Sequence, residues 1–550
     1  MKILWIDLNS SYAHSSLALP ALHAQIKDKS PYEWEMVSAT INENVGTVVE
    51  RIVAYQPDII AATMWLFNHE QLLHIISRVK ALLPKACLIL GGPEFLGENE
   101  TFLRCNPFVD AVFRGEGEEH FPQWLSCWDN PTAWATIDGL CYLDENSVYH
   151  DNRKAKTSAF DCLVPPEESR FFNWDKPFVQ LETTRGCFNT CAFCVSGGEK
   201  PVRALPIDTI RQRLDTIHQH GIKNVRVLDR TFNANPRHAK ELLNLFLEYH
   251  PHIRFHLEIH PALMNDALKS ELTRMPKGLL HLEAGIQSLR EPVLQQCRRM
   301  GKLADAMEGL KFLCSQSNLD THADLIAGLP LYRLEDILED IHTLASYCTG
   351  EIQLELLKLL PGTEMRMRAE ELGIRYSPLP PYEVLQTNEC TTAELQTARQ
   401  LSRLLDAFYN TPAWQELTRT LILNEEGFLL QFLDYLNKRN LTDQPMSLEK
   451  RGLVLYEYCQ KHYPQYQIQA SIAWIEAGMS LKKKPAERAK TKHQTPPDAW
   501  EILEGTYKEE LRLCFLPIDA EGTYGYWFGF EAESQRTTPV FKAKTSPNHD

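Results

Sequence analysis

The chain has 550 residues, of which 44% are hydrophobic and 23% charged, and this indicates a globular protein of several domains rather than a disordered chain. Its formal net charge of −15 argues against a broad nucleic-acid surface, so no nucleic-acid partner is expected. The sequence contains no apolar run of about 18 residues, so no membrane-spanning helix is expected. The N-terminus also lacks a signal-peptide pattern, and we expect a cytoplasmic protein without a membrane partner.

Strand and helix patterns alternate along residues 1–135. Helical patterns occupy 15–27, 44–55 and 68–83, and apolar runs predict strands at 2–8, 34–41, 58–65 and 87–91. The segment 110–125 supplies a further strand and helix. This alternation predicts an α/β fold with a Rossmann-like, doubly wound parallel sheet, which binds ligands beyond the carboxyl ends of its strands.

Three loops follow strands of this predicted sheet, and their glycines permit close approach to a large ligand. Ordinary strand-to-helix turns have the same composition, so this alternative stays open. The candidate ligand contacts in these loops are Asn9, His14, Gly91, Gly92, Glu94, Gly115, Glu116 and Gly117.

The rest of the chain divides into five regions. After a connector at 136–176, strand patterns at 178–184, 224–229, 253–259, 279–284, 321–327 and 351–357 predict a partial (β/α)6 barrel over 177–375. Helical spacing over 393–438 and 447–462 predicts a mostly helical domain at 376–478. A basic linker at 479–500 and a small β-rich tail at 501–550, with a hairpin at 510–531, complete the chain.

The 14 cysteines form no disulfide-like framework, but three of them lie together on a glycine-led loop. Cys187, Cys191 and Cys194 follow directly on the first predicted barrel strand. Thiolates suit iron, and three local ligands leave one position of a four-iron cluster open, as in catalytic metal sites. A zinc site would need a second ligand cluster, which is not evident. Three unrelated core cysteines are the other interpretation.

At these residues the sequence resembles the radical S-adenosylmethionine (SAM) superfamily, whose signature is CxxxCxxC. The resemblance implies a 4Fe-4S cluster on Cys187, Cys191 and Cys194, with the open iron binding the amino and carboxylate groups of SAM. It further implies reductive cleavage of SAM to a 5′-deoxyadenosyl radical that abstracts a hydrogen atom. The cofactors would supply this chemistry, and the protein would supply position and electrostatics.

The resemblance also implies SAM contacts around the barrel. Phe193 takes the place of an aromatic residue near adenine, and Asp229 takes the amino-group role of a Gly-Gly-Glu motif that this chain lacks. The later strands resemble the oxygen-independent coproporphyrinogen oxidase type of barrel, which adds Glu258, Gln287, Arg299 for the carboxylate and Asp324 for the ribose, with Arg298 as an alternative to Arg299. SAM is a zwitterion that also carries a ribose diol. Its ammonium group needs a carboxylate, its carboxylate needs a cation, and its ribose hydroxyls suit acceptor oxygens.

The N-terminal region followed by this barrel resembles the cobalamin-binding-domain class of the superfamily, and 357–387 with the helices after it resembles a C-terminal domain of unknown function in one branch. The resemblance covers about 1–470 and implies cobalamin as a cofactor. The DxHxxG motif of an axial histidine is absent, so the protein is expected to supply no such ligand. Members without the motif include cobalamin binders and proteins whose domain has lost the ligand.

The leading functional hypothesis is a radical SAM enzyme that methylates an unreactive carbon of a small-molecule or peptide substrate with the help of cobalamin. A second hypothesis keeps the radical chemistry but changes the reaction to methylthiolation, oxidation or rearrangement, with a vestigial cobalamin domain. A third is a non-enzymatic cluster or cobalamin sensor. The expected protein partner is an electron donor such as flavodoxin or ferredoxin. Methylation of unreactive carbon is preferred to tRNA methylthiolation. Methylthiotransferases typically bind a second cluster through N-terminal cysteines, and Cys87, Cys105 and Cys127 of this chain are too dispersed to hold one.

Overall fold

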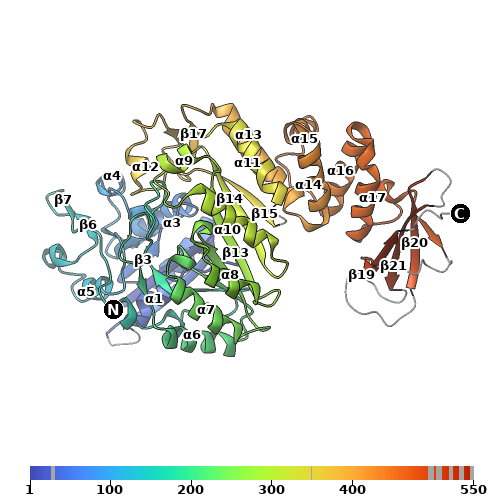
Figure 1. Ribbon diagram of the computed structural model, residues 1–550. Helices are drawn as coiled ribbons and strands as arrows, with labels where there is room; N and C mark the ends of the chain where they lie inside the picture. Colours follow the sequence, from blue (N-terminus) through green and yellow to red (C-terminus); the bar gives the residue numbers. More distant parts are fainter. Residues whose placement is uncertain are drawn as a thin grey trace. The chain divides into compact units, whose positions relative to one another are not determined.

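The computed structural model describes residues 1–26, 31–347, 350–492, 501–502, 511–519, 524–531 and 538–544 (Figure 1). The chain divides into two compact units. The first comprises Met1–Ile337 and Glu355–Leu395, and the second comprises Leu338–Leu354 and Gln396–Asp550. Among the described residues, every helix is too short or too polar to cross a membrane.

The first unit begins with a seven-stranded sheet of strand order β2-β1-β3-β4-β5-β6-β7. Strands β1 to β5 run parallel, and β6 and β7 add antiparallel at one edge. The strands are β1 (Lys2–Asn9), β2 (Glu33–Thr40), β3 (Ile59–Thr63), β4 (Cys87–Gly91), β5 (Ala111–Phe113), β6 (Leu140–Leu143) and β7 (Tyr149–Asp151). The helices are α1 (Ala18–Ile26), α2 (Val45–Ala54), α3 (His69–Leu82), α4 (Glu100–Cys105) and α5 (His120–Leu125). The predicted doubly wound parallel sheet is confirmed.

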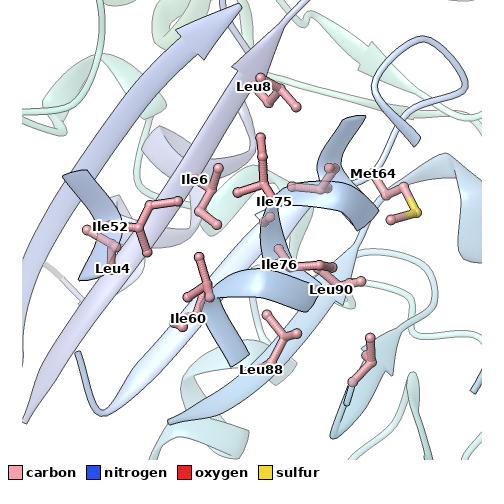
Figure 2. Packing of buried hydrophobic residues seen from close by; sticks show 14 of the residues in the cluster. Leu4, Ile6, Leu8, Ile52, Ile60, Met64, Ile75, Ile76, Leu88 and Leu90 are labelled. Atoms are coloured by element: carbon pink, nitrogen blue, oxygen red, sulfur yellow. The ribbon is translucent and has the colours of Figure 1, made fainter. Parts of the chain in front are cut away.

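Alternate residues of β1 enter two separate hydrophobic cores. Leu4, Ile6 and Leu8 pack with residues of α2 and α3, as Figure 2 shows. Ile3 and Trp5 belong to the other core, which includes residues of α1 and α5. Successive strand residues point to opposite faces, so a sheet covered by helices on both sides is apolar along its whole length. This is why the N-terminal strands read as continuous apolar runs.

The second sheet is the predicted partial barrel, with six strands in the order β15-β14-β13-β12-β11-β8. The registered pairs from β8 to β14 are parallel. The strands are β8 (Val179–Leu181), β11 (Asn224–Val227), β12 (Arg254–Ile259), β13 (Leu280–Gln287), β14 (Asp320–Ala327) and β15 (Glu351–Leu356). The helices are α6 (Ile207–Gln219), α7 (Pro236–Leu247), α8 (Asp266–Thr273), α9 (Glu291–Gln296), α10 (Leu303–Ser315), α11 (Leu334–Tyr347) and α12 (Glu364–Met367).

Strand β13 shows how the barrel separates its apolar and polar residues. Leu280, Leu282, Ala284 and Ile286 are buried, and the residues between them are half-buried. Because side chains alternate across a strand, the second set shares the opposite face. The polar residues of the expected SAM site lie on this second face. Two short antiparallel pairs complete the unit, β9 (Thr184–Arg185) with β10 (Arg203–Ala204) and β16 (Arg375–Tyr376) with β17 (Val384–Gln386).

The second unit is helical as far as Glu476. Its aromatic core includes Phe408, Phe428, Phe432 and Tyr458, which pack ring against ring and are buried. A π-helical turn, η7, joins the first two helices directly. The elements are α13 (Thr392–Leu404), η7 (Leu405–Tyr409), α14 (Pro412–Asn424), α15 (Phe428–Asn437), α16 (Leu448–His462) and α17 (Gln467–Glu476).

A five-stranded sheet of order β18-β20-β21-β22-β19 follows these helices. The expected hairpin is present, since β20 pairs antiparallel with β21 from Leu511 to Pro517. The expected linker differs in part, because Lys490–Lys492 forms β18 and pairs with β20, whose edge it covers. Residues 493–500 of that linker lie outside the described residues. The strands are β18 (Lys490–Lys492), β19 (Glu501–Ile502), β20 (Leu511–Pro517), β21 (Gly525–Glu531) and β22 (Phe541–Lys544).

Candidate functional site

The loop that carries the three cysteines begins at the carboxyl end of the first barrel strand. Gly186 precedes Cys187 and has a φ of +101°, a conformation that glycine adopts without strain. A Cβ atom at this position would lie 2.5 Å from the carbonyl oxygen of Glu199. The amide of Cys187 donates to that same carbonyl at 3.0 Å, so the two ends of the loop are held together. The glycine thus lets the loop close tightly enough to bring its cysteines into one place.

The three thiols lie within this one loop, and none of them forms a disulfide. Burial raises the pKa of the Cys191 thiol, the guanidinium of Arg299 opposes this, and the charges of Cys194 and Cys187 add to it. The pKa of Cys194 is likewise raised, first by burial. Because all three cysteines belong to one closed loop, their sulfurs can serve as ligands of one metal cluster. Three ligands from one loop suit a 4Fe-4S cluster with an open iron.

The expected SAM residues Gln287, Arg299 and Asp324 surround the Cα atom of Gly285, which carries no side chain. A Cβ atom there would lie 2.6 Å from Nε2 of Gln287, 3.7 Å from Nη2 of Arg299 and 3.9 Å from Oδ2 of Asp324. Arg299 also donates to the sulfur of Cys191 at 3.6 Å and to the carbonyl oxygen of Gly285. The structure therefore brings an amide, a cation and a carboxylate together beside the cysteine loop, as the sequence predicts.

Glu258 and Phe193 lie at the same end of the barrel as the thiols. Glu258 stands opposite Glu283 in the register of β12 and β13. Burial raises the pKa of Glu258 to about 6, and the charge of Glu283 contributes to the increase. Phe193 is half-buried in the cysteine loop, between Ala192 and Cys194. Among the described residues no counter-ion is at contact distance from Glu258, and a partly enclosed carboxylate of this kind is suited to bind an ammonium group.

Asp229 has a different place from the one expected. Its side chain is fully buried, and Oδ1 accepts hydrogen bonds from the amides of Thr183 and Thr184 at 2.8 Å each. The hydroxyl of Thr183 donates to Oδ2. Because both oxygens are engaged, Asp229 fastens the end of β8 to the end of β11 instead of facing a ligand. This role is invisible in a motif comparison, since the partners lie 46 residues away.

Histidines and carboxylates form a ladder across three barrel strands. Each strand contributes a histidine followed two residues later by a carboxylate: His256 and Glu258, His281 and Glu283, His322 and Asp324. Arg254 donates to Nδ1 of His281 at 3.3 Å, so His281 donates through Nε2 to Nδ1 of His322 at 2.9 Å.

The direction of these hydrogen bonds decides which ring nitrogen of His322 carries the proton. His322 then carries its proton on Nε2, which faces Glu283 at 3.4 Å and Asp324 at 3.6 Å. The ligand atoms of these three residues lie within 4.8 Å of one another, but a metal would need the lone pair that the proton occupies. Burial raises the pKa of Asp324 to about 7, and the charge of Glu283 adds to this. The ladder therefore ends beside Asp324, with Nε2 of His322 at ion-pair distance from Oδ1 rather than hydrogen-bonded to it.

A cavity of about 690 Å³ lies between the loops of the N-terminal sheet and the first strands of the barrel. Its N-terminal wall includes seven of the eight residues expected to contact a large ligand: Asn9, His14, Gly91, Gly92, Gly115, Glu116 and Gly117. Trp5, Trp65 and Phe67 add aromatic surface to the same wall. The cavity is mostly apolar with a few charged groups, which is typical of cofactor sites.

Glu94 is the eighth residue, and the structure places it elsewhere. Its side chain is buried, and Oε2 accepts a hydrogen bond from the Tyr382 hydroxyl at 2.6 Å and lies 2.8 Å from Nδ1 of His69. Glu94 therefore ties the N-terminal sheet to the segment after the barrel, and its oxygen is not available to a ligand.

A set of ion pairs joins the N-terminal loop Gly115–Glu118 to the start of the cysteine loop. Arg185 donates to Glu116 at 3.2 Å, to Glu118 at 2.9 Å and to Glu182 at 2.7 Å. Arg203 makes two hydrogen bonds to Glu116, at 3.0 and 2.5 Å. Burial tends to raise the pKa of Glu116, but Arg203, the amide of residue 157 and Arg185 lower it to about 2. The Glu116 carboxylate is thus committed to the barrel, although its backbone lines the cavity.

Three family models match consecutive parts of this chain. They are the B12 binding domain at 6–125, the radical SAM superfamily at 181–344 and a protein of unknown function, DUF4080, at 370–496. The chain thus contains a B12-binding domain, a radical SAM domain and a DUF4080 domain in this order. The sequence-based resemblance to this class, including its C-terminal branch, is confirmed.

Curated proteins that are similar to this chain include methyltransferases. An uncharacterized methyltransferase of Pyrococcus horikoshii is 26% identical over 36% of this chain and 44% of its own length. The cobalamin-dependent radical SAM methyltransferase TokK of Streptomyces tokunonensis is 22% identical over 62% of this chain and 52% of its own length. The chain therefore spans about half the length of these relatives.

A solved structure supports the fold. The radical SAM methyltransferase TsrM from Kitasatospora setae, with cobalamin and a 4Fe-4S cluster bound, aligns with a TM-score of 0.57 at 17% identity. The alignment covers 72% of this chain and 80% of TsrM.

Sequence reasoning missed three features of this site. The ladder was detectable, because a histidine precedes a carboxylate by two residues on three successive predicted strands. The pairing of Arg185 with Glu116 and Glu118 was not detectable, since the sequence around a charged residue does not identify its ion-pair partner. The third missed residue, Arg230, lines the cavity directly after Asp229.

Proposed function

We propose that this enzyme is a cobalamin-dependent radical SAM methyltransferase that methylates a carbon atom. The carrying observation is that one compact unit holds both the three-cysteine loop and the large cavity, whose lining includes Arg185, two residues before Cys187. The match of residues 6–125 to the B12 binding domain and the similarity to TokK support cobalamin as the occupant of that cavity. The mainly apolar wall formed by the N-terminal sheet would accommodate a flat macrocycle.

The cysteine loop and the strand ends would bind the cluster and SAM. Bound at these residues, the cluster would supply the electron that cleaves SAM, and cobalamin would supply the methyl group. Cys187, Cys191 and Cys194 would hold three irons. Arg299, next to the sulfur of Cys191, would bind the SAM carboxylate, and Glu258 would bind the ammonium group.

The remaining contacts would orient the adenosine part of SAM. Asp324 would accept hydrogen bonds from the ribose hydroxyls through Oδ2, which faces Gly285, while His322 supports its other oxygen. Gln287, with a φ of 72°, would donate from the position beside Gly285. Phe193 would pack near the adenine. Asp229 would act as a positioning residue that holds the loop between β8 and the thiols.

The cavity residues would contact cobalamin without an axial histidine. His14 lines the cavity, but its Nδ1 lies 2.8 Å from the hydroxyl of Ser11, and the motif of an axial ligand is absent. We assign the cobalamin contacts to residues 1–135 and the SAM contacts to residues 177–375. The electron would come from a small reductant protein such as flavodoxin or ferredoxin.

The test uses the full chain, purified anaerobically with its cluster reconstituted. Dithionite, SAM carrying a labelled methyl group and hydroxocobalamin are added, and 5′-deoxyadenosine and retained cobalamin are quantified. Cys191→Ala should abolish deoxyadenosine formation. Cys297→Ala is the matched control, because this buried cysteine contacts the loop through its carbonyl group and lies outside the motif. Deoxyadenosine without retained cobalamin would contradict cobalamin dependence, and equal loss in both variants would contradict the assigned ligands.

A further inference from the structure

Three arginines line the cavity among the described residues, and two of them are neutralised by carboxylates. Arg185 is paired with Glu116, Glu118 and Glu182. Arg213 donates to Glu167 at 2.8 and 3.1 Å and to the carbonyl oxygen of Glu182 at 3.0 Å. The third, Arg230, is exposed to the cavity, and no carboxylate of the described chain lies within ion-pair distance of it. An arginine left unpaired in a cofactor-sized cavity is available to an anionic ligand.

The backbone on both sides of Arg230 is held firmly. Asp229 is fixed by its hydrogen bonds to the end of β8. Thr231 places its hydroxyl 3.8 Å from the sulfur of Cys187. Asn233 exchanges two hydrogen bonds with the backbone of His260, at 2.8 and 2.9 Å. Arg230 therefore extends from a rigid segment, and a ligand would lose little free energy in ordering the backbone around it.

Arg230 stands at the end of the cavity nearest the thiols and the expected SAM site. Thr231, the next residue, places its hydroxyl against the sulfur of Cys187, so Arg230 lies one residue from a contact with the cysteine loop. Strand β11, which ends shortly before Arg230, pairs with β12, the strand that carries Glu258. Arg230 thus lies beside the cysteine loop while it lines the cavity.

We propose that Arg230 binds a carboxylate or phosphate group of the methyl acceptor. The inference rests on the proposed function, since the acceptor must reach both cobalamin and SAM, and Arg230 lies where the two sites meet. The SAM carboxylate already has Arg299 beside the cluster loop. The side chains of the corrin ring are neutral amides, so the cobalamin tail phosphate is the competing anion. Arginine binds carboxylate and phosphate through two parallel hydrogen bonds, which fixes orientation as well as charge.

The first test measures the chemical accessibility of Arg230 in the full chain with cluster, SAM and cobalamin bound. Butanedione modifies arginines, and peptide mass spectrometry reports each site separately. Inorganic phosphate and acetate serve as the probe anions. Arg237, which is exposed on the first turn of α7, is the internal control in the same digest. At a probe concentration of about ten times its Kd, modification of Arg230 should slow about tenfold while Arg237 is unaffected.

The outcomes separate the possible anions. Protection by phosphate or acetate beyond that given by the cofactors supports an acceptor site. Full protection by SAM alone, or by cobalamin alone, would assign Arg230 to that cofactor and overturn the proposal. The absence of protection by either probe anion would also overturn it. These results do not depend on methyl transfer, so they remain interpretable if the proposed reaction is not observed.

The second test follows the label of methyl-labelled SAM into the small molecules of a cell extract. Labelled product should be retained on an anion-exchange resin. Arg230→Gln should lower its rate of formation about ten- to a hundredfold, which is the usual effect of losing a charged hydrogen bond. Arg230→Lys should restore part of the rate, and Arg237→Gln should match the wild type. The ratio of labelled product to deoxyadenosine should fall in Arg230→Gln and should keep its wild-type value in Arg237→Gln. A neutral product, or an unchanged rate in Arg230→Gln, would refute the inference.

Discussion

Replacing Glu116 by glutamine should release the N-terminal loop from the barrel. The folded protein holds the pKa of this carboxylate at about 2, against an ordinary value of 4.5, chiefly through Arg203, with the amide of Thr157 and Arg185 contributing. A difference of this size corresponds to about 3 kcal/mol of stabilisation. Glutamine keeps the shape of the side chain but removes the charge, and it leaves two largely enclosed guanidinium groups with fewer partners. Glu118 and Glu182 still pair with Arg185, so we expect local opening rather than global unfolding.

Amide hydrogen exchange in the peptide around Thr157 reports this opening directly, because the Thr157 amide donates to Glu116 at 2.9 Å. Near neutral pH, exchange should be about a hundredfold faster in Glu116→Gln. The matched control is Glu119→Gln, since Glu119 accepts from the amides of Ser158 and Ala159 at 3.0 Å without an arginine partner among the described residues. An equal effect of the two variants would show that the arginine charges do not stabilise the loop.

The pH dependence of the same measurement has a definite sign. The pKa of Glu116 is lower in the folded chain than in the unfolded one, so its contribution is complete above about pH 4.5 and is lost as the pH falls toward 2. The difference between wild type and Glu116→Gln should therefore shrink on acidification. A difference that grew at low pH would refute the reasoning.

Three further predictions concern the SAM site. Gly285→Ala should weaken SAM binding about tenfold or more in equilibrium dialysis while iron content is kept, because the added Cβ would lie 2.6 Å from Nε2 of Gln287; unchanged binding would place SAM elsewhere. The Kd for SAM should fall as the pH rises from 6 to 8, because Asp324, with a pKa of about 7, becomes a better acceptor as it ionises. Asp324→Asn should flatten this dependence. If the profile of Asp324→Asn equals that of the wild type, Asp324 is excluded as the source of the dependence. Arg254→Leu should move the midpoint of the profile, since it removes the donor that sets the histidine tautomers; an unmoved midpoint would show that the ladder does not reach Asp324.

The fold was largely predictable from the sequence because strand periodicity and the cysteine spacing are local signals. Alternation predicted a strand at 279–284, whereas β13 continues to Gln287, a residue that the family resemblance and not the alternation had supplied. The chemistry of Asp229 and Glu94 was not predictable in the same way. Both are carboxylates at loop positions where ligands bind, but their partners lie 46 and 288 residues away. Whether a carboxylate faces a ligand or a neighbouring segment depends on tertiary packing, which leaves no pattern at the residue itself.

The outer edge of β15 determines where this chain can be cut to give fragments that stay in solution. β15 is a terminal strand of its sheet, and the Asn410 side chain accepts from the amide of Ile352 and donates to its carbonyl group, at 2.9 Å each. Nε2 of Gln415 donates to the carbonyl oxygen of Gly350 at 3.0 Å. These side-chain amides take the place of a neighbouring strand. A fragment that ends before Asn410 would present a bare strand edge to other chains, and such edges recruit further copies into aggregates. Expression of the barrel alone should therefore yield insoluble protein, whereas longer fragments that retain residues 410–415 should stay in solution.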